Sequence, residues 1–547
     1  MRSILLFLAL ILFSGTLFSQ SKSAPKLVVG IVVDQMVYDY LYRFQDRFSK
    51  GGFLKLMNEG TNCRNTQYNY VPTFTGPGHA SIYTGTTPNQ HGIVGNDWYD
   101  RDQQSAVNCV TDSSVNSVGT ESNDGLRSPR NLNCMTITDQ LKVTYAKSKV
   151  ISVSIKDRSA VLPGGHMSDG SYWYDYATGK FITSDFYKKQ LPAYVDQFNQ
   201  KEYPKSVMGN TWNTLYPIET YSASGPDDTR YEVVLPNKTS ATFPYNFNAI
   251  ATEKSQFNLF TITPWANTYL TDFALTALVN ENLGKGEASD FLCISYSTPD
   301  IAGHAFGPYS VEMEDMYLRL DLEIQRLLEA IKQQVGKNAV VFLTADHAVV
   351  PVPEWLTDHH LPGGYAFLKE NMLELQEAVK VKFGADFIAI EENNNIYLNE
   401  ELIDFMEADK SVIENFIAKE VRKWEGVKYV FTSEDLSRAS AGDQFAEMVK
   451  NGFDPIRSGN VLFMLAPGYL PKSADSESSR KGTSHGSPYN YDTHVPLLWY
   501  GKNIPKQEIF ERVEITDIVP TLTHILNLQK PACTTGEPIL PILNKKK

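Results

Sequence analysis

Two pairs of aspartate and histidine side chains have the spacing expected of metal ligands. Asp300 and His304 are four positions apart, so a helical turn can place the carboxylate and the imidazole on one side. Asp346 and His347 are adjacent. Both residue types bind zinc, although single pairs of this kind also occur by chance on protein surfaces. The assignment of these pairs as metal ligands therefore depends on whether the predicted strands and helices bring them together.

Support for this assignment comes from apolar runs that read as buried strands and end in polar residues. The four runs are Leu27–Val33, Val150–Ile155, Phe291–Tyr296 and Val340–Leu343. Asp34 directly follows the first run, and the two Asp/His pairs follow the last two. Ligands of open α/β sheets bind at the carboxyl ends of strands, so these side chains should converge. His485, in a Gly/Ser-rich loop, is a further candidate ligand.

Thr75 is a candidate nucleophile. It precedes Gly76, Pro77 and Gly78 at the start of a helix-compatible segment, and a helix N-terminus favours an anion. A threonine hydroxyl is a poor nucleophile near neutral pH, but coordination to Zn²⁺ lowers the pKa of a bound oxygen. The alternative is that Thr75 only caps the helix.

Strand-like runs alternating with long helical patterns predict an α/β fold, with a sheet between helices on both faces. Helices are expected over Pro264–Leu283 and Val311–Val335, where apolar residues recur at helical spacing. A weakly periodic, aromatic stretch at about 165–260 is interpreted as an inserted cap segment. A second inserted segment, at about 353–455, is expected to have helices and strands of its own, after which Val461–Leu465 should resume the core. The polar stretch Lys472–Lys481 is expected to be a mobile loop.

The N-terminus reads as a signal peptide over residues 1–20, which leaves a catalytic region over 25–547. Its apolar run is shorter than a membrane-spanning helix needs, so no stable membrane insertion is expected. The net charge of −13 argues against a nucleic-acid partner. Cys293 falls in a strand pattern and is expected to be a packed thiol, which leaves four cysteines whose pairing stays open.

Seven motifs occur along the chain in one order: V-V-D-Q, T-x-T-G-P-G-H, H-G-I-x-G-N, K-D-R, T-P-D-x-x-G-H, T-A-D-H and S-H-G. In these motifs the sequence resembles the alkaline phosphatase superfamily, and within it the secreted phosphate-irrepressible enzymes of flavobacteria. The resemblance covers nearly the whole chain after the leader. It implies an alkaline-phosphatase-like fold and an alkaline phosphatase that acts on small phosphate monoesters and releases inorganic phosphate.

The resemblance also implies two Zn²⁺ ions per subunit. One zinc ion would be held by Asp300, His304 and His485. The other would be held by Asp34, Asp346, His347 and the oxygen of Thr75. Thr75 would attack the substrate and form a phosphothreonine. No acidic residue is evident for a third, magnesium site, so two metal ions are expected.

The resemblance assigns roles to three more residues. Asn96 would hydrogen-bond a phosphoryl oxygen, and Lys156 and Arg158 would favour monoesters, which carry one more negative charge than diesters. Read without the other motifs, Lys156-Asp157-Arg158 is a charged surface turn after a strand. His79, His91 and His494 are expected to be structural.

Two other functions are compatible with this scaffold. A phosphodiesterase or nucleotide pyrophosphatase would differ in its ratio of monoester to diester turnover. A catalytically inactive envelope-binding protein would show damage to the ligand set, which is intact here. A sulfatase is disfavoured because Thr75 lies in no C/S-x-P-x-R context. The oligomeric state is not predicted.

Overall fold

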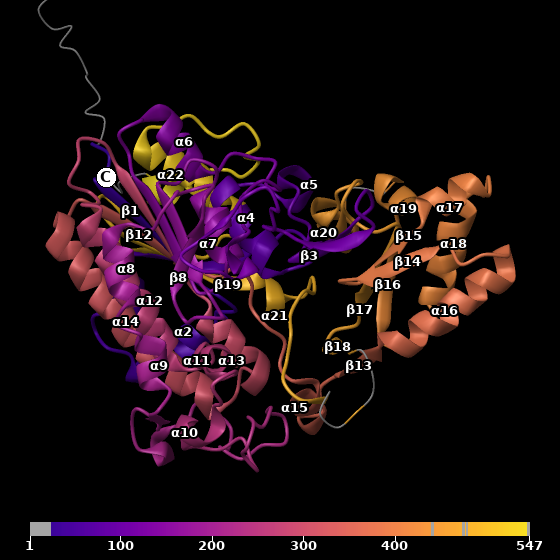
Figure 1. Ribbon diagram of the computed structural model, residues 1–547, viewed down its shortest axis with the longest axis horizontal. Helices are drawn as coiled ribbons and strands as arrows, with labels where there is room; N and C mark the ends of the chain where they lie inside the picture. Colours follow the sequence, from indigo (N-terminus) through magenta and orange to yellow (C-terminus); the bar gives the residue numbers. More distant parts are fainter. Residues whose placement is uncertain (1–22, 439–441, 473–475, 477–479, 544–547) are drawn as a thin grey trace, which may run out of the picture.

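A central β-sheet with helices on both faces forms the body of the protein in the computed structural model, which describes residues 23–438, 442–472, 476 and 480–543 (Figure 1). Its strands, in spatial order, are β20 (Gln507–Ile509), β2 (Thr61–Gln67), β19 (His494–Gly501), β12 (Ala339–Thr344), β1 (Leu27–Val33), β11 (Asp290–Tyr296), β6 (Val150–Ser154), β7 (Gly170–Tyr174), β8 (Phe181–Ser184) and β5 (Ser117–Val118). A further short strand, β21 (Val513–Glu514), pairs with β2. The α/β prediction is confirmed.

The four apolar runs of the sequence are the neighbouring strands β12, β1, β11 and β6 at the centre of this sheet. They pair in parallel, for example Val29 with Leu292 on one side and Val341 on the other. Every residue of these strands is buried, which explains why they read as continuous apolar runs instead of alternating patterns. Because the strands are parallel, their carboxyl ends meet at one edge.

The sheet is covered by α12 (Pro264–Asn280) and α14 (Val311–Val335) on one face and by α4 (Thr75–Thr84), α7 (Arg158–Gly164) and α22 (Ile518–Leu526) on the other (Figure 1). The bounds of α14 agree with the prediction. Helix α12 ends three residues before the expected Leu283, because Asn282 adopts a left-handed conformation (φ 53°). The amides of Asn282 and Leu283 then bond back to Val279 and Leu278, as in a Schellman motif.

The first predicted insertion, residues 165–260, is only partly a cap. Strands β7 and β8 lie within it, but they extend the main sheet beyond β6, so the interpretation as a cap is wrong for this part of the segment. The remainder forms the short helices α8 (Ala193–Asn199), α9 (Tyr203–Val207), α10 (Phe247–Ile250) and α11 (Gln256–Phe260), with a two-stranded sheet of β9 (Thr211–Trp212) and β10 (Tyr245–Asn246). The buried aromatic residues of β7 had obscured its strand character.

The second insertion has a sheet and a core of its own (Figure 1). Its strands are β14 (Ile388–Glu392), β15 (Asn395–Leu398), β17 (Val461–Leu465) and β16 (Val427–Thr432), packed against α16 (Leu368–Phe383) and α18 (Lys410–Val421). The expectation that Val461–Leu465 resumes the main core is therefore wrong. A buried strand of a small sheet has the same apolar pattern as one of a large sheet. The chain returns to the main sheet at α21 (Asn490–Thr493) and β19.

Cys134 and Cys533 form a disulfide, whereas Cys63, Cys109 and Cys293 are buried free thiols. Cys293 thus packs as expected, and the set of four remaining cysteines yields one pair. The expected signal peptide and most of the loop predicted over 472–481 lie outside the described residues. Within the described part of the chain, no helix has both the length and the apolar composition required to cross a bilayer.

Candidate active site and metal centre

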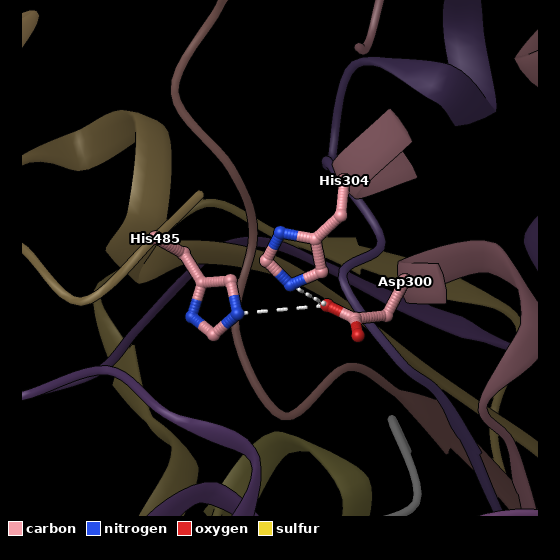
Figure 2. Close-up of side chains that lie close together, drawn as sticks. All are labelled: Asp300, His304 and His485. Atoms are coloured by element: carbon pink, nitrogen blue, oxygen red, sulfur yellow. Dashed lines mark ion pairs between the residues drawn. The ribbon is translucent and has the colours of Figure 1, made fainter. Parts of the chain in front are cut away.

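The first candidate metal site consists of Asp300, His304 and His485, whose ligand atoms lie within 4.8 Å of one another (Figure 2). The Nε2 atoms of His304 and His485 are 3.2 and 3.5 Å from Asp300 Oδ1. Asp300 and His304 lie one turn apart on α13 (Thr298–Phe306), directly after β11. His485 comes from the loop before α21, nearly two hundred residues further along the chain.

Backbone hydrogen bonds fix the orientation of both imidazoles. Nδ1 of His304 is 2.8 Å from the carbonyl of Thr483, and Nδ1 of His485 is 2.8 Å from the carbonyl of Thr73. A carbonyl only accepts, so each Nδ1 carries a proton, and a neutral ring would present the lone pair of Nε2 to the site. Metal-binding histidines are commonly held by such partners.

The second candidate site lies at the ends of β1 and β12. His347 Nε2 is 3.5 Å from Asp34 Oδ1 and 3.6 Å from Asp346 Oδ2. All three atoms are buried and have no hydrogen-bond partner among the described residues. Asp34, His347 and Asp300 also form a group within 4.8 Å, so Asp300 lies between the two sites. Buried unpartnered ligand atoms that face one another fit a bound cation.

The electrostatics of the carboxylates agree with a metal centre. Burial raises the pKa of Asp34 to about 6 even though Lys156 opposes the shift. Burial and the neighbouring Asp34 also raise the pKa of Asp346 well above its ordinary value. Asp34 and Asp346 are therefore costly to keep ionised, whereas His304 and Lys156 hold the pKa of Asp300 well below its ordinary value despite burial. Divalent cations would remove that cost, and the Asp/His donor set suits zinc.

Thr75 is the first residue of α4 and is almost fully buried. The Nζ of Lys156, which follows β6, is 3.3 Å from Thr75 Oγ1 and 2.7 Å from Asp34 Oδ2. It also donates to Asp300 at 2.5 Å. Gly78 lets α4 approach this closely, because a Cβ there would lie 2.3 Å from the carbonyl oxygen of Asp346. The lysine therefore joins the threonine to both candidate metal sites.

Asn96 and Arg158 border the same site. The side-chain oxygen of Asn96 accepts from the amide of Gly76 at 2.8 Å, which leaves its Nδ2 group to donate elsewhere. Arg158 begins α7, and its Nε is buried with no partner among the described residues. The structure thus brings the candidate ligands, Thr75, Asn96 and Lys156 into one site, and Arg158 follows Lys156 by two residues.

Three functional candidates escaped the sequence analysis. Gln35 donates from Nε2 to Asp300 at 2.7 Å and from its amide to Asp346 at 3.1 Å, so it connects the two ligand groups. Its φ of 62° is unusual for a residue other than glycine and is a sign of local constraint. Asp157 and Arg127 form an ion pair of 2.6 Å beside Arg158. Gln35 and Asp157 lie inside the motifs V-V-D-Q and K-D-R, whereas nothing in the sequence marked Arg127.

The three histidines expected to be structural all have partners outside the two ligand groups, and Nδ1 of His79 also lies 3.4 Å from Asp346 Oδ2. His79 Nε2 is 2.8 Å from Ser295 Oγ, His91 Nε2 is 3.0 Å from Ser81 Oγ, and His494 Nε2 is 3.1 Å from the carbonyl of Arg64. His79 is closest to the site, because its Nδ1 bonds the carbonyl of Thr75 at 2.9 Å. Its ring therefore supports the backbone of the threonine.

This fold, with Asp/His groups at the ends of central strands and a threonine at a helix N-terminus, defines the alkaline-phosphatase-like class of α/β proteins. The model of the family described as type I phosphodiesterase/nucleotide pyrophosphatase matches residues 28–488, and the chain belongs to this family.

Relatives extend over nearly the whole chain. This chain is 39% identical to alkaline phosphatase PafA of Elizabethkingia meningoseptica, over 98% of each chain. It is also 39% identical to alkaline phosphatase PhoV of Synechococcus elongatus, over 96% of this chain and 94% of the relative. The crystal structure of wild-type PafA superposes with a TM-score of 0.91, covering 95% of this chain and 99% of that one. The resemblance inferred from the motifs is thereby confirmed.

Proposed function

We propose that this protein is a zinc-dependent alkaline phosphatase that hydrolyses a broad range of phosphate monoesters through a phosphothreonine at Thr75. One observation carries the proposal. Lys156 Nζ lies within hydrogen-bonding distance of Thr75, Asp34 and Asp300, so a candidate nucleophile, a cation and both ligand groups share one site. The alkaline phosphatases to which the chain is 39% identical support it.

In this proposal one zinc ion is bound by Asp300, His304 and His485. The residues that would bind the other are Asp34, Asp346, His347 and the Thr75 oxygen. Bound zinc supplies Lewis acidity, which lowers the pKa of a coordinated oxygen and stabilises charge on the entering and leaving oxygens. A bound cation is most needed by three buried atoms that have no hydrogen-bond partner among the described residues, namely Asp34 Oδ1, Asp346 Oδ2 and His347 Nε2.

The chain's own residues bind and orient the phosphoryl group. Thr75 loses its hydroxyl proton to solvent as Oγ1 attacks phosphorus, the ester P–O bond breaks, and the leaving alkoxide takes a proton from water to depart as the alcohol. Water then cleaves the phosphothreonine to release inorganic phosphate. Asn96 donates a hydrogen bond from Nδ2 to a phosphoryl oxygen, because its Oδ1 is already occupied by the Gly76 amide.

Lys156 and Arg158 favour a monoester because its phosphoryl group carries an additional negative charge. A cation about 4 Å from that charge contributes roughly 4 kcal/mol at an effective dielectric constant near 20. Applied to the transition state, this corresponds to about three orders of magnitude in rate. A diester has no charge at that position and gains little from the two cations.

A second candidate is a phosphodiesterase or nucleotide pyrophosphatase, which the description of the matched family favours. Lys156, which lies beside Thr75, and Arg158, two residues further along, favour the monoesterase. An inactive envelope-binding protein is the least supported alternative, since every candidate ligand side chain is present and lies within the site.

We also propose that the protein is exported and that its leader is removed, which places it in the periplasm or outside the cell. The apolar N-terminal segment of the sequence and the disulfide between Cys134 and Cys533 support this location. Disulfides persist in oxidising compartments.

The test is hydrolysis of 4-nitrophenyl phosphate and bis(4-nitrophenyl) phosphate by zinc-loaded protein, compared with Lys156→Ala/Arg158→Ala. We expect the monoester to be strongly preferred and its kcat/KM to fall by about three orders of magnitude in the double variant. Arg158→Ala is measured as well, because it leaves the carboxylate-bound Lys156 in place. The exposed Lys147→Ala is the control.

Three further readouts separate the alternatives. Metal analysis should give two zinc ions per chain, and mass spectrometry after an acid quench should find phosphate on Thr75 but not in Thr75→Ala. A diester preference that the double variant leaves unchanged would assign the protein to the phosphodiesterases. Zinc-loaded protein without activity on either ester would support the binding-protein alternative.

A further inference from the structure

A cavity of about 200 Å³ adjoins the candidate metal site on the side of His485. The catalytic core contributes Phe74, His485 and Tyr491 to its wall. On the opposite side, β17 of the second insertion contributes Leu462, Met464 and Leu465. Figure 1 shows β17 facing α21, the short helix that carries Tyr491. The cavity is therefore a joint product of the core and the second insertion.

The chemistry of the wall is predominantly aliphatic and aromatic. Among the described residues that line the cavity, none is a lysine or an arginine, and Asp492 is the sole carboxylate. The carboxylate of Asp492 already accepts the backbone amide of Ser487 at 2.8 Å. A wall without cations does not suit a phosphate group. An apolar cavity of about 150 Å³ is large enough to bind benzene, so this one can accommodate an aromatic ring.

The cavity lies where the alcohol portion of a substrate would emerge. In phosphoryl transfer the attacking and leaving oxygens are roughly in line across phosphorus. In the proposed function Thr75 Oγ1 attacks from the side of Lys156 and Asp34, so the leaving oxygen would lie across phosphorus, toward the ligand group that contains His485. The ring of Phe74 meets the ring of His485 edge-on, with centroids 5.6 Å apart. The apolar wall thus starts at the residue before the nucleophile and at a candidate metal ligand.

The rim of the cavity is a rigid hairpin. Strands β14 and β15 are joined by the two-residue turn Asn393-Asn394, with φ of 56° and 61°, as in a type I′ turn. The Nδ2 group of Asn393 donates to the carbonyl of Asp97 at 2.8 Å. The amide of Phe463 donates to the carbonyl of Asn394 at 3.0 Å. The first bond fixes the tip of the insertion against the chain segment that carries Asn96, and the second joins the hairpin to β17.

We propose that this cavity is a leaving-group subsite, which binds the aromatic or other apolar alcohol portion of a phosphate monoester. The proposal rests on the proposed function and adds a substrate class to it. Monoesters of aromatic alcohols gain binding energy in the cavity, whereas monoesters of small alcohols leave it empty. The second insertion, through β17 and its hairpin, thereby sets substrate preference without contacting the phosphoryl group.

The test compares phenyl phosphate with methyl phosphate in Leu462→Trp, which narrows the cavity from the partly exposed position on β17. Each variant is compared with wild type on the same substrate, so the different intrinsic reactivities of the two esters cancel. We expect kcat/KM for phenyl phosphate to fall about tenfold or more, and that for methyl phosphate to change less than about twofold. The inhibition constant of inorganic phosphate should likewise stay within about twofold.

Two more variants complete the experiment. Leu462→Ala removes part of the wall without adding side-chain volume, so it tests the subsite if the tryptophan variant does not fold. We expect kcat/KM for phenyl phosphate to fall about tenfold, selectively over that for methyl phosphate. Leu373→Trp, on an exposed position of α16 in the same insertion, is the matched control. Equal effects on both substrates, or no effect in either Leu462 variant, would overturn the subsite. Wild-type protein that hydrolyses neither ester would instead overturn the proposed function.

Discussion

Lys156 and Arg158 are held in place by different contacts, although they are two positions apart. The ammonium group of Lys156 is surrounded by the carboxylates of Asp34 and Asp300, which are themselves candidate metal ligands. Arg158 instead lies next to Asp157, whose other oxygen accepts from Arg127 at 2.6 Å. Arg127 and Arg158 together hold the pKa of Asp157 below its ordinary value, even though burial opposes the shift. We therefore expect Arg127 to act as a positioning residue for Arg158.

Replacing Arg127 tests this role. In Arg127→Ala, Asp157 loses its strongest partner and draws the Arg158 guanidinium toward itself, away from the phosphoryl group. We expect kcat/KM for a monoester to fall by about one to two orders of magnitude, while that for a diester changes little, since small misplacements of a binding group have effects of this size. The ratio of the two activities is the measurement.

Arg130→Ala is the control, because its ion pair with Asp112 is 3.4 Å long and its side chain is 65% exposed. Arg127→Lys should restore part of the lost monoester activity. A parallel loss of monoester and diester activity in Arg127→Ala would show that the residue acts only on stability.

Helix α14 attaches the first insertion to the core through the acidic residues of its first turns. Glu312 accepts from Tyr245 at 2.5 Å, Glu314 from Ser224 at 2.5 Å, and Asp315 from Trp212 at 2.7 Å. Carboxylates near a helix N-terminus interact favourably with the helix dipole. A single helix end therefore anchors three separate points of the insertion.

The stability of this contact should depend on pH through Glu312. Burial raises its pKa from 4.5 to about 8, despite the hydrogen bond from Tyr245. The folded protein thus keeps a proton that the unfolded chain releases, so the free energy of unfolding decreases as pH rises from about 4.5 to about 8. Glu312→Gln cannot ionise and still accepts from Tyr245. We expect it to raise the thermal midpoint relative to wild type more at pH 8.5 than at pH 5.

Circular dichroism during heating measures both midpoints. Glu329→Gln changes an exposed glutamate on the same helix and should give the same difference from wild type at both pH values. The neighbouring groups Glu232, Asp227 and Lys238 are unchanged in either variant. If Glu312→Gln lowers the midpoint equally at both pH values, the side chain is ionised in the folded protein and the interpretation is wrong.

Across the whole molecule, the C-terminal segment closes onto the helix that carries the candidate nucleophile. Cys533 is linked to Cys134, 399 residues earlier. Next to it, Thr534 Oγ1 donates to the carbonyl of Thr84 at 2.7 Å, and the amide of Thr535 donates to the carbonyl of Gly85 at 2.9 Å. These bonds satisfy backbone groups at the end of α4. The disulfide therefore supports the tail that caps this helix.

Removing the disulfide should lower stability without changing the metal site. For Cys134→Ser/Cys533→Ser we expect the free energy of unfolding to fall by about 2–5 kcal/mol, which is typical for the loss of a native disulfide. Urea denaturation measures it, with and without reductant. Reductant should destabilise wild type to the level of the double variant and leave the variant unchanged. Equal destabilisation of both proteins by reductant would contradict the role of this bond.

The sequence by itself determined the central strands and the residues at their ends. Continuous apolar runs have few structural solutions, and parallel strands place their carboxyl ends at one edge. For this reason the amino-acid order was enough to locate Asp34, Lys156, Asp300 and Asp346 together. Thr75 could be placed at a helix start because Pro77 and the flanking glycines favour that position. The motif order then placed Asn96, Arg158 and His485 in the same site.

Only the tertiary structure decided which sheet a strand joins. Strand β17 has the apolar pattern of the main sheet yet pairs with β15 and β16, and β7 reads as part of a cap yet extends the main sheet. The local pattern of apolar residues predicts that a strand is buried. Which strand it pairs with depends on contacts between residues far apart in the sequence. The same limit applies to Gln35, to the pairing of Cys134 with Cys533, and to the cavity between Phe74 and Leu462. Each of these features exists only where distant segments meet.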